Sequence, residues 1–121
     1  MKSKCTIDSD GTKFWYLNHN LHRIDGPAVE YANGTKSWYL NGERHREDGP
    51  AIECANGNKY WYLNGKLHRT DGPAIERTDG TKYWFINDKE LTFKQWLSEV
   101  WDMLSREEQK KYAFNGFQYE K

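Results

Sequence analysis

The sequence predicts a mainly β protein: an elongated, curved, single-layer antiparallel meander of 23-residue repeats, capped by a C-terminal helix pair. Tryptophan recurs at one constant spacing, and Asn-Gly or Asp-Gly pairs recur in the same phase, as a repeat array of hairpins requires. Beyond residue 88 the hydrophobic period becomes that of a helix. We therefore expect a repeat sheet over 1–88 and a helical cap over 89–121. The recurring tryptophans are Trp15, Trp38, Trp61 and Trp84.

Two families of turns divide each repeat. Asn-Gly and Asp-Gly supply the positive φ angles of a two-residue type I′ hairpin turn, so both families are predicted to have this form. Two turns per unit imply two strands per unit, and therefore eight strands that pair with their sequence neighbours. The first family comprises Asp10-Gly11, Asn33-Gly34, Asn56-Gly57 and Asp79-Gly80, and the second comprises Asn41-Gly42 and Asn64-Gly65.

An Asp-Gly-Pro segment interrupts the second strand of each unit. Proline cannot donate to a strand ladder and glycine marks a bend, so each segment is predicted to be a bulge or corner where the strand changes direction. The sheet is therefore expected to curve. The segments are Asp25-Gly26-Pro27, Asp48-Gly49-Pro50 and Asp71-Gly72-Pro73.

Two-residue turns also fix the cross-strand register and hence the two faces of the sheet. They place Trp61 opposite His68 and Ile52, and Tyr60 opposite Arg69. Because side chains alternate along a strand, the tryptophans are expected to share one buried face with the aliphatic column, and the tyrosines to share the other with the arginines and glutamates. The aliphatic column is Val29, Ile52 and Ile75, and the charged columns are Arg23, Arg46, Arg69 and Glu30, Glu53, Glu76.

The C-terminal segment carries two helix signals. Thr92 with Gln95 forms a capping box before an amphipathic pattern over 93–104, and Ser105 with Glu108 forms a second box before a shorter helix. We expect that second helix to end near Asn115-Gly116, and the tail to fold back through Phe114, Phe117 and Tyr119.

The helical cap is shorter than the sheet it must cover. A twelve-residue helix is about 18 Å long, whereas eight strands span about 38 Å, so the helices are expected to cover about half of the Trp face. The other half, around Trp15, Val29 and Trp38, then needs another cover. Curvature of the sheet, a homodimer through this uncovered face, or a protein partner could supply it.

Composition excludes several classes of function. The 121 residues carry eighteen basic and eighteen acidic side chains, so charge alone implies no polyanionic partner. Cys5 and Cys54 are expected to be small buried fillers rather than a disulfide pair. The start has no apolar signal segment and no apolar run is long enough to span a membrane. The sequence thus predicts a soluble, cytoplasmic protein, in the host cytoplasm if a phage encodes it.

The repeat resembles the MORN repeat. The resemblance rests on the run from Tyr60 to His68, the later Gly72 and the closing Asp79-Gly80, and it extends over about residues 4 to 88. The nearest variant carries Trp-Tyr-Leu-Asn-Gly, His-Arg and Asp-Gly-Pro-Ala, and is similar to repeats in bacterial, prophage and phage proteins. The Asp-Gly-Pro-Ala segment departs from the usual Gly-x-Gly. The resemblance implies a single-layer sheet that binds or scaffolds proteins, while some such arrays have been linked to lipid surfaces.

The recurring His-Arg-x-Asp motif favours structure over catalysis. It resembles part of a kinase catalytic loop, but the spacing is wrong and the downstream Asn is missing. Equivalent histidines two strands apart lie about 9–10 Å from one another, too far to share a zinc ion. We expect His to pack beside Trp and Asp to cap the turn, with no cofactor, no metal site and no enzymatic activity. The motif occurs at His22, His45 and His68.

The tyrosine and arginine columns have the composition of a protein interface. Alternatively, they stabilise the sheet as a cation–π ladder, with Arg23 on Phe14 and Arg69 on Tyr60. The two interpretations are compatible. The predicted partner-binding residues are Tyr16, Tyr39, Tyr62, Arg23, Arg46, Arg69, Trp15 and Trp38.

The favoured hypothesis is therefore a non-enzymatic protein-interaction module. If a phage or prophage encodes it, the resemblance suggests an inhibitor of a host defence protein. The alternative is a nucleotide or nucleic-acid binder that uses the repeated His-Arg pairs as phosphate clamps, and its binding would depend steeply on salt.

Overall fold

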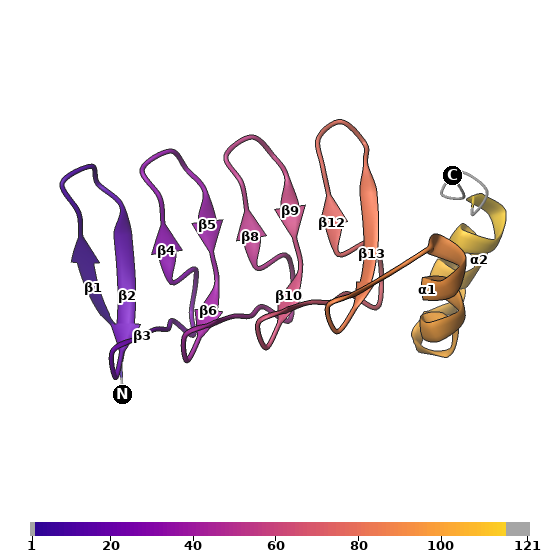
Figure 1. The fold of residues 1–121 in the computed structure, drawn as a ribbon, viewed down its shortest axis with the longest axis horizontal. Coiled ribbons are helices and arrows are strands. Elements are labelled where there is room, and N and C mark those ends of the chain that lie inside the picture. The colour runs from indigo at the N-terminus through magenta and orange to yellow at the C-terminus, as the bar shows by residue number, and fades with distance from the viewer. Residues whose placement is uncertain (1, 116–121) are drawn as a thin grey trace.

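The computed structural model describes residues 2–115 as an elongated row of hairpins with two helices at one end (Figure 1). This confirms the predicted mainly β meander with a helical cap. The N-terminal strand lies at the opposite end of the row from the helices. The strands are β1 (Lys4–Ile7), β2 (Lys13–Leu17), β3 (Asn20–Leu21), β4 (Val29–Glu30), β5 (Lys36–Ser37), β6 (Tyr39–Leu40), β7 (Glu43–Arg44), β8 (Ile52–Glu53), β9 (Lys59–Tyr60), β10 (Tyr62–Leu63), β11 (Lys66–Leu67), β12 (Ile75–Glu76), β13 (Lys82–Ile86) and β14 (Lys89–Leu91).

The main sheet follows the chain in order and is antiparallel throughout. Its strand order is β1-β2-β4-β5-β8-β9-β12-β13-β14, and β3 pairs with β2. The remaining strands form two small hairpins, β6-β7 and β10-β11. Almost every strand therefore pairs only with strands close to it in sequence, as a meander requires.

The second strand of each unit is split by the Asp-Gly-Pro segment, as the predicted corner implies. In the first unit its two parts are β3 and β4. Between them the backbone leaves the ladder of its own unit and turns to the next one, since the Arg23 N–H donates to the Tyr39 carbonyl (3.2 Å). The bend thus joins neighbouring units through backbone hydrogen bonds.

The two turn families have different geometries, although both contain Asn-Gly. In the second family both turn residues have positive φ, 52° at Asn64 and 78° at Gly65, which confirms the predicted type I′ turn. In the first family only the glycine does, as at Gly57 (φ 100°). There the Cys54 N–H donates to the Asn58 carbonyl (2.9 Å), which closes a three-residue loop with a glycine bulge.

The prediction of type I′ turns was therefore wrong for the first family, and the extra loop residue shifts the register by one. Ile52 pairs with Tyr60 rather than with Trp61. A shift of one residue moves a side chain to the other face of a sheet. The aliphatic column consequently lies on the tyrosine side, not with the tryptophans as predicted: Val29 pairs with Phe14, and Ile75 with Tyr60 and Tyr83.

The cap consists of α1 (Phe93–Val100), the short 3₁₀ helix η1 (Trp101–Met103) and α2 (Arg106–Asn115). Both predicted capping boxes form: the Gln95 N–H donates to the Thr92 hydroxyl (3.1 Å) and the Glu108 N–H to the Ser105 hydroxyl (3.1 Å). The predicted helix over 93–104 ends its α-helical part at Val100. The tail contacts predicted for Phe114, Phe117 and Tyr119 lie outside the described side chains, as does Gly116.

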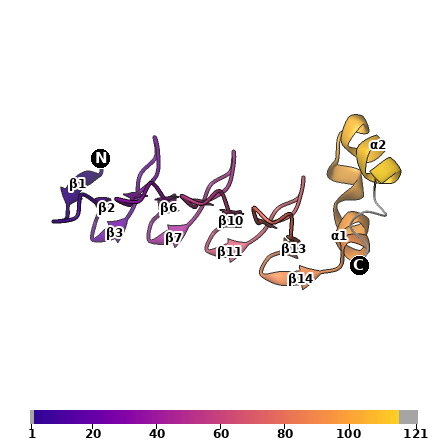
Figure 2. The ribbon, with the colours of Figure 1, turned by 90° about the horizontal axis from the view of Figure 1, so that it is seen from above.

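The helices stand at the end of the row rather than along either face of the sheet (Figure 2). The expectation that they cover half of the Trp face was wrong. They pack on the last unit, where the main hydrophobic core forms. They also reach back to the third unit, because the Trp96 indole N–H donates to the Arg69 carbonyl (2.8 Å) and the Tyr112 hydroxyl to the Asp71 carbonyl (3.1 Å). The buried core residues are Trp84, Phe93, Trp96, Val100, Leu104 and Tyr112.

Both cysteines are free thiols, but Cys5 is exposed and Cys54 only partly buried. The expectation of a buried filler was wrong for Cys5. The reason is its position on β1, all four residues of which are exposed, whereas the equivalent Ala28 lies between two strands and is fully buried.

Candidate functional site

The first repeated cluster places an arginine over a tryptophan. Cζ of Arg23 lies 3.9 Å from the centroid of the Trp15 ring. The corresponding distance is 3.8 Å for Arg46 over Trp38 and for Arg69 over Trp61. A guanidinium this close to a ring face makes a cation–π contact. We call this side of the sheet the Arg-Trp face.

The same arginine is hydrogen-bonded through Nε and Nη1 within its own unit. Nε of Arg23 donates to Asp25 (3.1 Å), and Nη1 donates to the Pro27 carbonyl (3.1 Å) and to Glu30 (3.0 Å). Arg46 and Arg69 repeat these bonds with distances of 2.8–3.1 Å. Each guanidinium is therefore neutralised by two carboxylates, which leaves it poorly suited to bind a phosphate.

The glycine of Asp-Gly-Pro provides the space for this guanidinium. A Cβ on Gly26 would lie 3.1 Å from Cζ of Arg23, one on Gly49 3.0 Å from Arg46, and one on Gly72 only 2.6 Å from Arg69. The motif therefore supplies a carboxylate, a gap and a carbonyl around one arginine. The sequence alone did not reveal this role, because the residues of the cluster do not follow strand alternation.

The structure corrects the predicted arginine partners. Arg23 and Arg69 lie over Trp15 and Trp61, not over Phe14 and Tyr60. The chain has left the ladder before it reaches each arginine, so the alternation rule no longer assigns its face. The tryptophans of the first three units are consequently half-buried under guanidinium groups, and the uncovered Trp surface predicted around Trp15 and Trp38 does not exist.

The fourth unit has Thr92 where the others have this arginine, and Trp84 is covered by the cap. Its ring centroid lies 5.0 Å from that of Phe93 and 4.5 Å from that of Trp96, and it is 5 % exposed. The helices therefore replace the arginine cluster that a complete fourth unit would have supplied.

Each histidine of the motif links two neighbouring units. Nδ1 of His22 accepts the Asn41 N–H (2.9 Å), Nδ1 of His45 that of Asn64 (2.9 Å) and Nδ1 of His68 that of Asn87 (3.0 Å). This contact requires an unprotonated Nδ1. Burial lowers the pKa of His68, which favours the neutral form that the bond needs.

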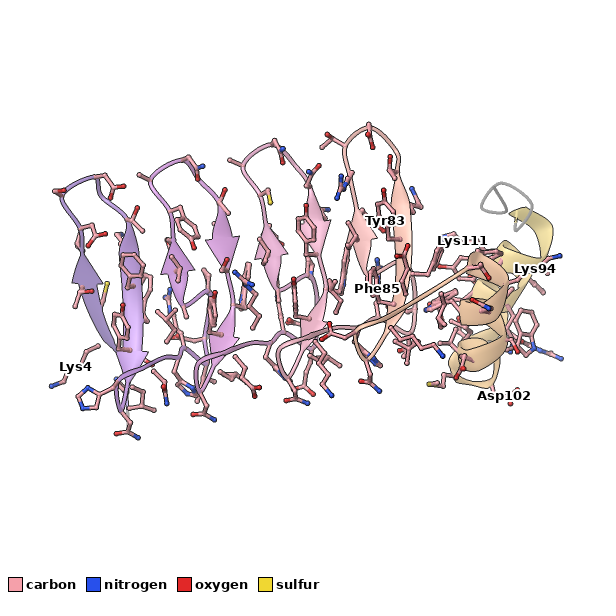
Figure 3. All side chains as sticks on the ribbon, in the orientation of Figure 1. Lys4, Tyr83, Phe85, Lys94, Asp102 and Lys111 are labelled. Atoms are coloured by element: carbon pink, nitrogen blue, oxygen red, sulfur yellow. The ribbon has the colours of Figure 1, made fainter. Side chains whose placement is uncertain are left out.

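The opposite side of the sheet is lined by aromatic rings, and we call it the aromatic face. Tyr16 is 37 % exposed, and the other rings are half-buried. Within residues 2–115, none of the tyrosine hydroxyls on this face makes a hydrogen bond. Figure 3 shows Tyr83 and Phe85, its last members, on β13. The aromatic face comprises Phe14, Tyr16, Tyr39, Tyr60, Tyr62, Tyr83 and Phe85.

Arg44 lies near the middle of the aromatic face. It pairs with Tyr39 across the β6-β7 hairpin, and its Cζ lies 5.7 Å from the Tyr39 ring and 5.6 Å from the Tyr62 ring. Its Nε is buried without a hydrogen-bond partner, and the guanidinium forms no ion pair with any described residue. No carboxylate of the described residues neutralises the charge of Arg44, whereas two carboxylates neutralise that of Arg46.

The predicted partner-binding residues therefore divide between the two faces. Tyr16, Tyr39 and Tyr62 lie on the aromatic face. The other members lie together on the Arg-Trp face, namely Arg23, Arg46, Arg69, Trp15 and Trp38. Sequence reasoning missed Arg44. The available signal was that the second unit has arginine where the first and third have Leu21 and Leu67.

Neither a metal-binding cluster nor a membrane-spanning helix occurs within residues 2–115. Residues 2–115 contain no group of three or more His, Cys, Asp or Glu side chains arranged to hold a metal ion. Within the same range, neither helix is long and apolar enough to cross a membrane. Comparison with protein-family models and with curated proteins finds no match to this chain.

Proposed function

We propose that this chain is a non-enzymatic, MORN-like interaction module that binds a protein through its aromatic face. The observation that carries the proposal is the unpaired Arg44 between Tyr39 and Tyr62, with aromatic rings on both sides along the sheet. Large rigid rings and arginine are the residue types that dominate binding hot spots. The tyrosine hydroxyls of the aromatic face make no hydrogen bond within residues 2–115, so they remain able to form hydrogen bonds with a partner.

The Arg-Trp face supports binding less well. In each of its arginines, Nε and Nη1 already donate to an Asp, a Glu and a proline carbonyl of the same unit, as Arg46 does. A partner would have to break these bonds before it could use Arg23, Arg46 or Arg69, and that cost opposes binding. This is why the proposal moves from the arginines expected from the sequence to Arg44.

Arg44 also indicates the chemistry of the partner. A guanidinium with unused donors forms its strongest contacts with carboxylates, often through two parallel bonds. The surrounding rings favour apolar and aromatic side chains. The proposed partner surface therefore carries an Asp or Glu side chain among apolar residues. The resemblance to phage and prophage repeats makes a host protein, including a defence protein, the class to test first.

The alternative of nucleotide or nucleic-acid binding has no specific observation in its favour. The His-Arg pairs on which it depends are occupied: His45 accepts a backbone N–H and Arg46 is bonded to two carboxylates. Repeated phosphate clamps would need unpaired cations in register. Arg44 occurs in one unit only, so the array does not repeat it.

The test is a capture experiment with matched variants. Immobilised wild type is exposed to host lysate next to Arg44→Leu, which installs the leucine of the neighbouring units, and Tyr62→Ala. Lys59→Ala, an exposed change on the Arg-Trp side, is the control. We expect a stoichiometric protein that is retained by wild type and the control and lost from both aromatic-face variants. Equal retention by all four baits would overturn the proposal, and so would loss from Lys59→Ala alone.

A further inference from the structure

β1 is the edge strand of the sheet, and it pairs with β2 in the same register that the interior strands use. Cys5, Thr6 and Ile7 pair with Trp15, Phe14 and Lys13, just as Val29 and Glu30 of β4 pair with the following strand. Interior strands of this type have neighbours on both sides, but among the described residues β1 pairs only with β2. An exposed strand edge is a template for pairing with another chain.

Backbone alternation tells which groups of β1 face this open edge. The Asp8 N–H donates to the Thr12 carbonyl (2.9 Å), so Asp8 and Thr6 direct their backbone groups to β2. Since neighbouring residues of a strand point their N–H and C=O groups in opposite directions, those of Cys5 and Ile7 face outward. These four groups are available to an added strand.

On the Arg-Trp side, the side chains of this edge do not protect it. Ile7 is 65 % exposed and occupies the position at which Glu30 bonds Arg23 in the next unit. Cys5 beside it is also exposed. Both project from the Arg-Trp side of β1. An exposed apolar pair on an open edge strand is the reverse of the devices by which sheets usually prevent edge pairing.

The sequence of β1 and its flanks is complementary to itself when antiparallel. About Thr6 as the centre, Lys4 faces Asp8, and Cys5 faces Ile7. Lys4 and Asp8 are exposed and neither forms an ion pair with a described residue. Figure 3 shows the Lys4 side chain pointing away from the array at its free end.

We propose that two copies of this chain pair antiparallel through β1, with a two-fold axis at Thr6. Cys5 and Ile7 of each copy then exchange backbone hydrogen bonds with Ile7 and Cys5 of the other, and Lys4 forms an ion pair with Asp8 on both sides of the axis. The result is one continuous sheet with a helical cap at each end. The contact involves one short strand, so the dimer is weak and concentration-dependent.

The pairing can be tested by reversing the charges of Lys4 and Asp8 and measuring the mass of the protein in solution. Lys4→Glu and Asp8→Lys each place like charges opposite one another in a homodimer, whereas an equal mixture of the two restores opposite charges in a heterodimer. Light scattering over a concentration series should show the wild type rising from 14.4 kDa toward twice that value. Each single variant should stay monomeric, and their mixture should recover the rise. A wild type that stays at 14.4 kDa up to millimolar concentration would overturn the proposal, as would single variants that dimerise like wild type.

A cross-link tests the register. On the proposed axis the two Thr6 residues form a non-hydrogen-bonded pair, whose Cα atoms lie about 4.5 Å apart and within reach of a disulfide. In a Cys5→Ser, Cys54→Ser background, Thr6→Cys should give a covalent dimer under mild oxidation, and Lys13→Cys on the adjacent strand should not. Equal cross-linking of both variants, or none with Thr6→Cys, contradicts the register. Neither experiment changes Arg44, Tyr39 or Tyr62, so its failure does not bear on the proposed function.

Discussion

Cζ of Arg46 lies 3.8 Å from the centroid of the Trp38 ring, while its Nε and Nη1 bond Asp48 and Glu53. One side chain therefore covers the tryptophan of its unit and forms hydrogen bonds to residues at the start of the Asp-Gly-Pro bend and just beyond it. In a thin sheet with little aliphatic core, such repeated clusters are expected to contribute a large share of the stability.

The first prediction removes one cluster. Arg46→Ala should lower the free energy of unfolding by about 1–3 kcal/mol, since it removes a cation–π contact and leaves the half-buried Glu53 without its cation, whereas Asp48 is largely exposed and contributes little. Denaturant unfolding measures the loss. Lys36→Ala, an exposed lysine without an ion pair within residues 2–115, should change stability by less than about 0.5 kcal/mol. Equal effects of the two changes would contradict the role given to Arg46.

The second prediction concerns Gly72. Gly72→Ala should cost more than Gly49→Ala, because the added Cβ would lie 2.6 Å from Cζ of Arg69 but 3.0 Å from that of Arg46. The guanidinium cannot move aside without losing its bonds. In a double-mutant cycle, Gly72→Ala should cost little once Arg69 is alanine. Additive free energies of unfolding would show that the glycine acts through its backbone and not through the arginine.

The third prediction is a pH dependence that arises from His68. Burial lowers its pKa from 6.5, so the unfolded chain binds the proton more readily than the folded one. The stability from this group is complete above about pH 6.5 and declines as pH falls below that value. His68→Gln should flatten the slope of unfolding free energy between about pH 7.5 and 5, and Lys66→Gln should not.

Asp10 and Asp79 do not contribute to the slope of unfolding free energy between about pH 7.5 and 5. A hydrogen bond from the Thr12 N–H lowers the pKa of Asp10, and hydrogen bonds from Thr81 lower that of Asp79. The stability that they contribute is present above their unfolded pKa of 3.8 and is lost at lower pH. A slope that survives His68→Gln in the higher range would assign the dependence to another group.

The fourth prediction tests the contact between the cap and the third unit. Trp96→Phe keeps an aromatic ring against Trp84 but removes the indole N–H that donates to the Arg69 carbonyl (2.8 Å). Because Trp96 is fully buried, we expect a loss of about 1–3 kcal/mol from the unsatisfied carbonyl and the smaller ring. Gln95→Ala, on the exposed side of α1, should cost about 1 kcal/mol or less through its capping box. Denaturant unfolding followed by Trp fluorescence compares the two.

The predictions from sequence succeeded where short-range rules apply. The turn at Asn64-Gly65 and the capping boxes at Thr92 and Ser105 depend on a few adjacent residues, and they form as expected. Asn56-Gly57 has the same two residues as Asn64-Gly65 but closes a longer loop. The dipeptide does not determine the loop length. Because the prediction missed the resulting shift of one residue, it assigned the aliphatic column to the wrong face.

The faces of the arginines could not be predicted for a related reason. Alternation holds from Lys66 to Leu67 in β11, but the chain then bends away, and the side chain of Arg69 returns to Trp61. Its position is set by Asp71, Glu76 and the Pro73 carbonyl together. A rule about pairs of strand residues cannot represent that cluster. The role proposed for Arg44 likewise depends on its lack of ionic partners within residues 2–115, which only the three-dimensional arrangement shows.

The last prediction uses two turns that adopt the type I′ form without glycine. His19 has φ 69° and Asp88 has φ 70°, where glycine stands in the other units. A side chain in this left-handed region is strained, so His19→Gly should stabilise the protein by about 0.5–1 kcal/mol. Asp88→Gly should bring no such gain, because the Asp88 carboxylate accepts the Leu67 N–H (2.8 Å) and that bond is lost. Thermal unfolding should therefore shift upward for His19→Gly only. An equal upward shift for both would mean that the bond to Leu67 contributes nothing and that strain alone governs these turns.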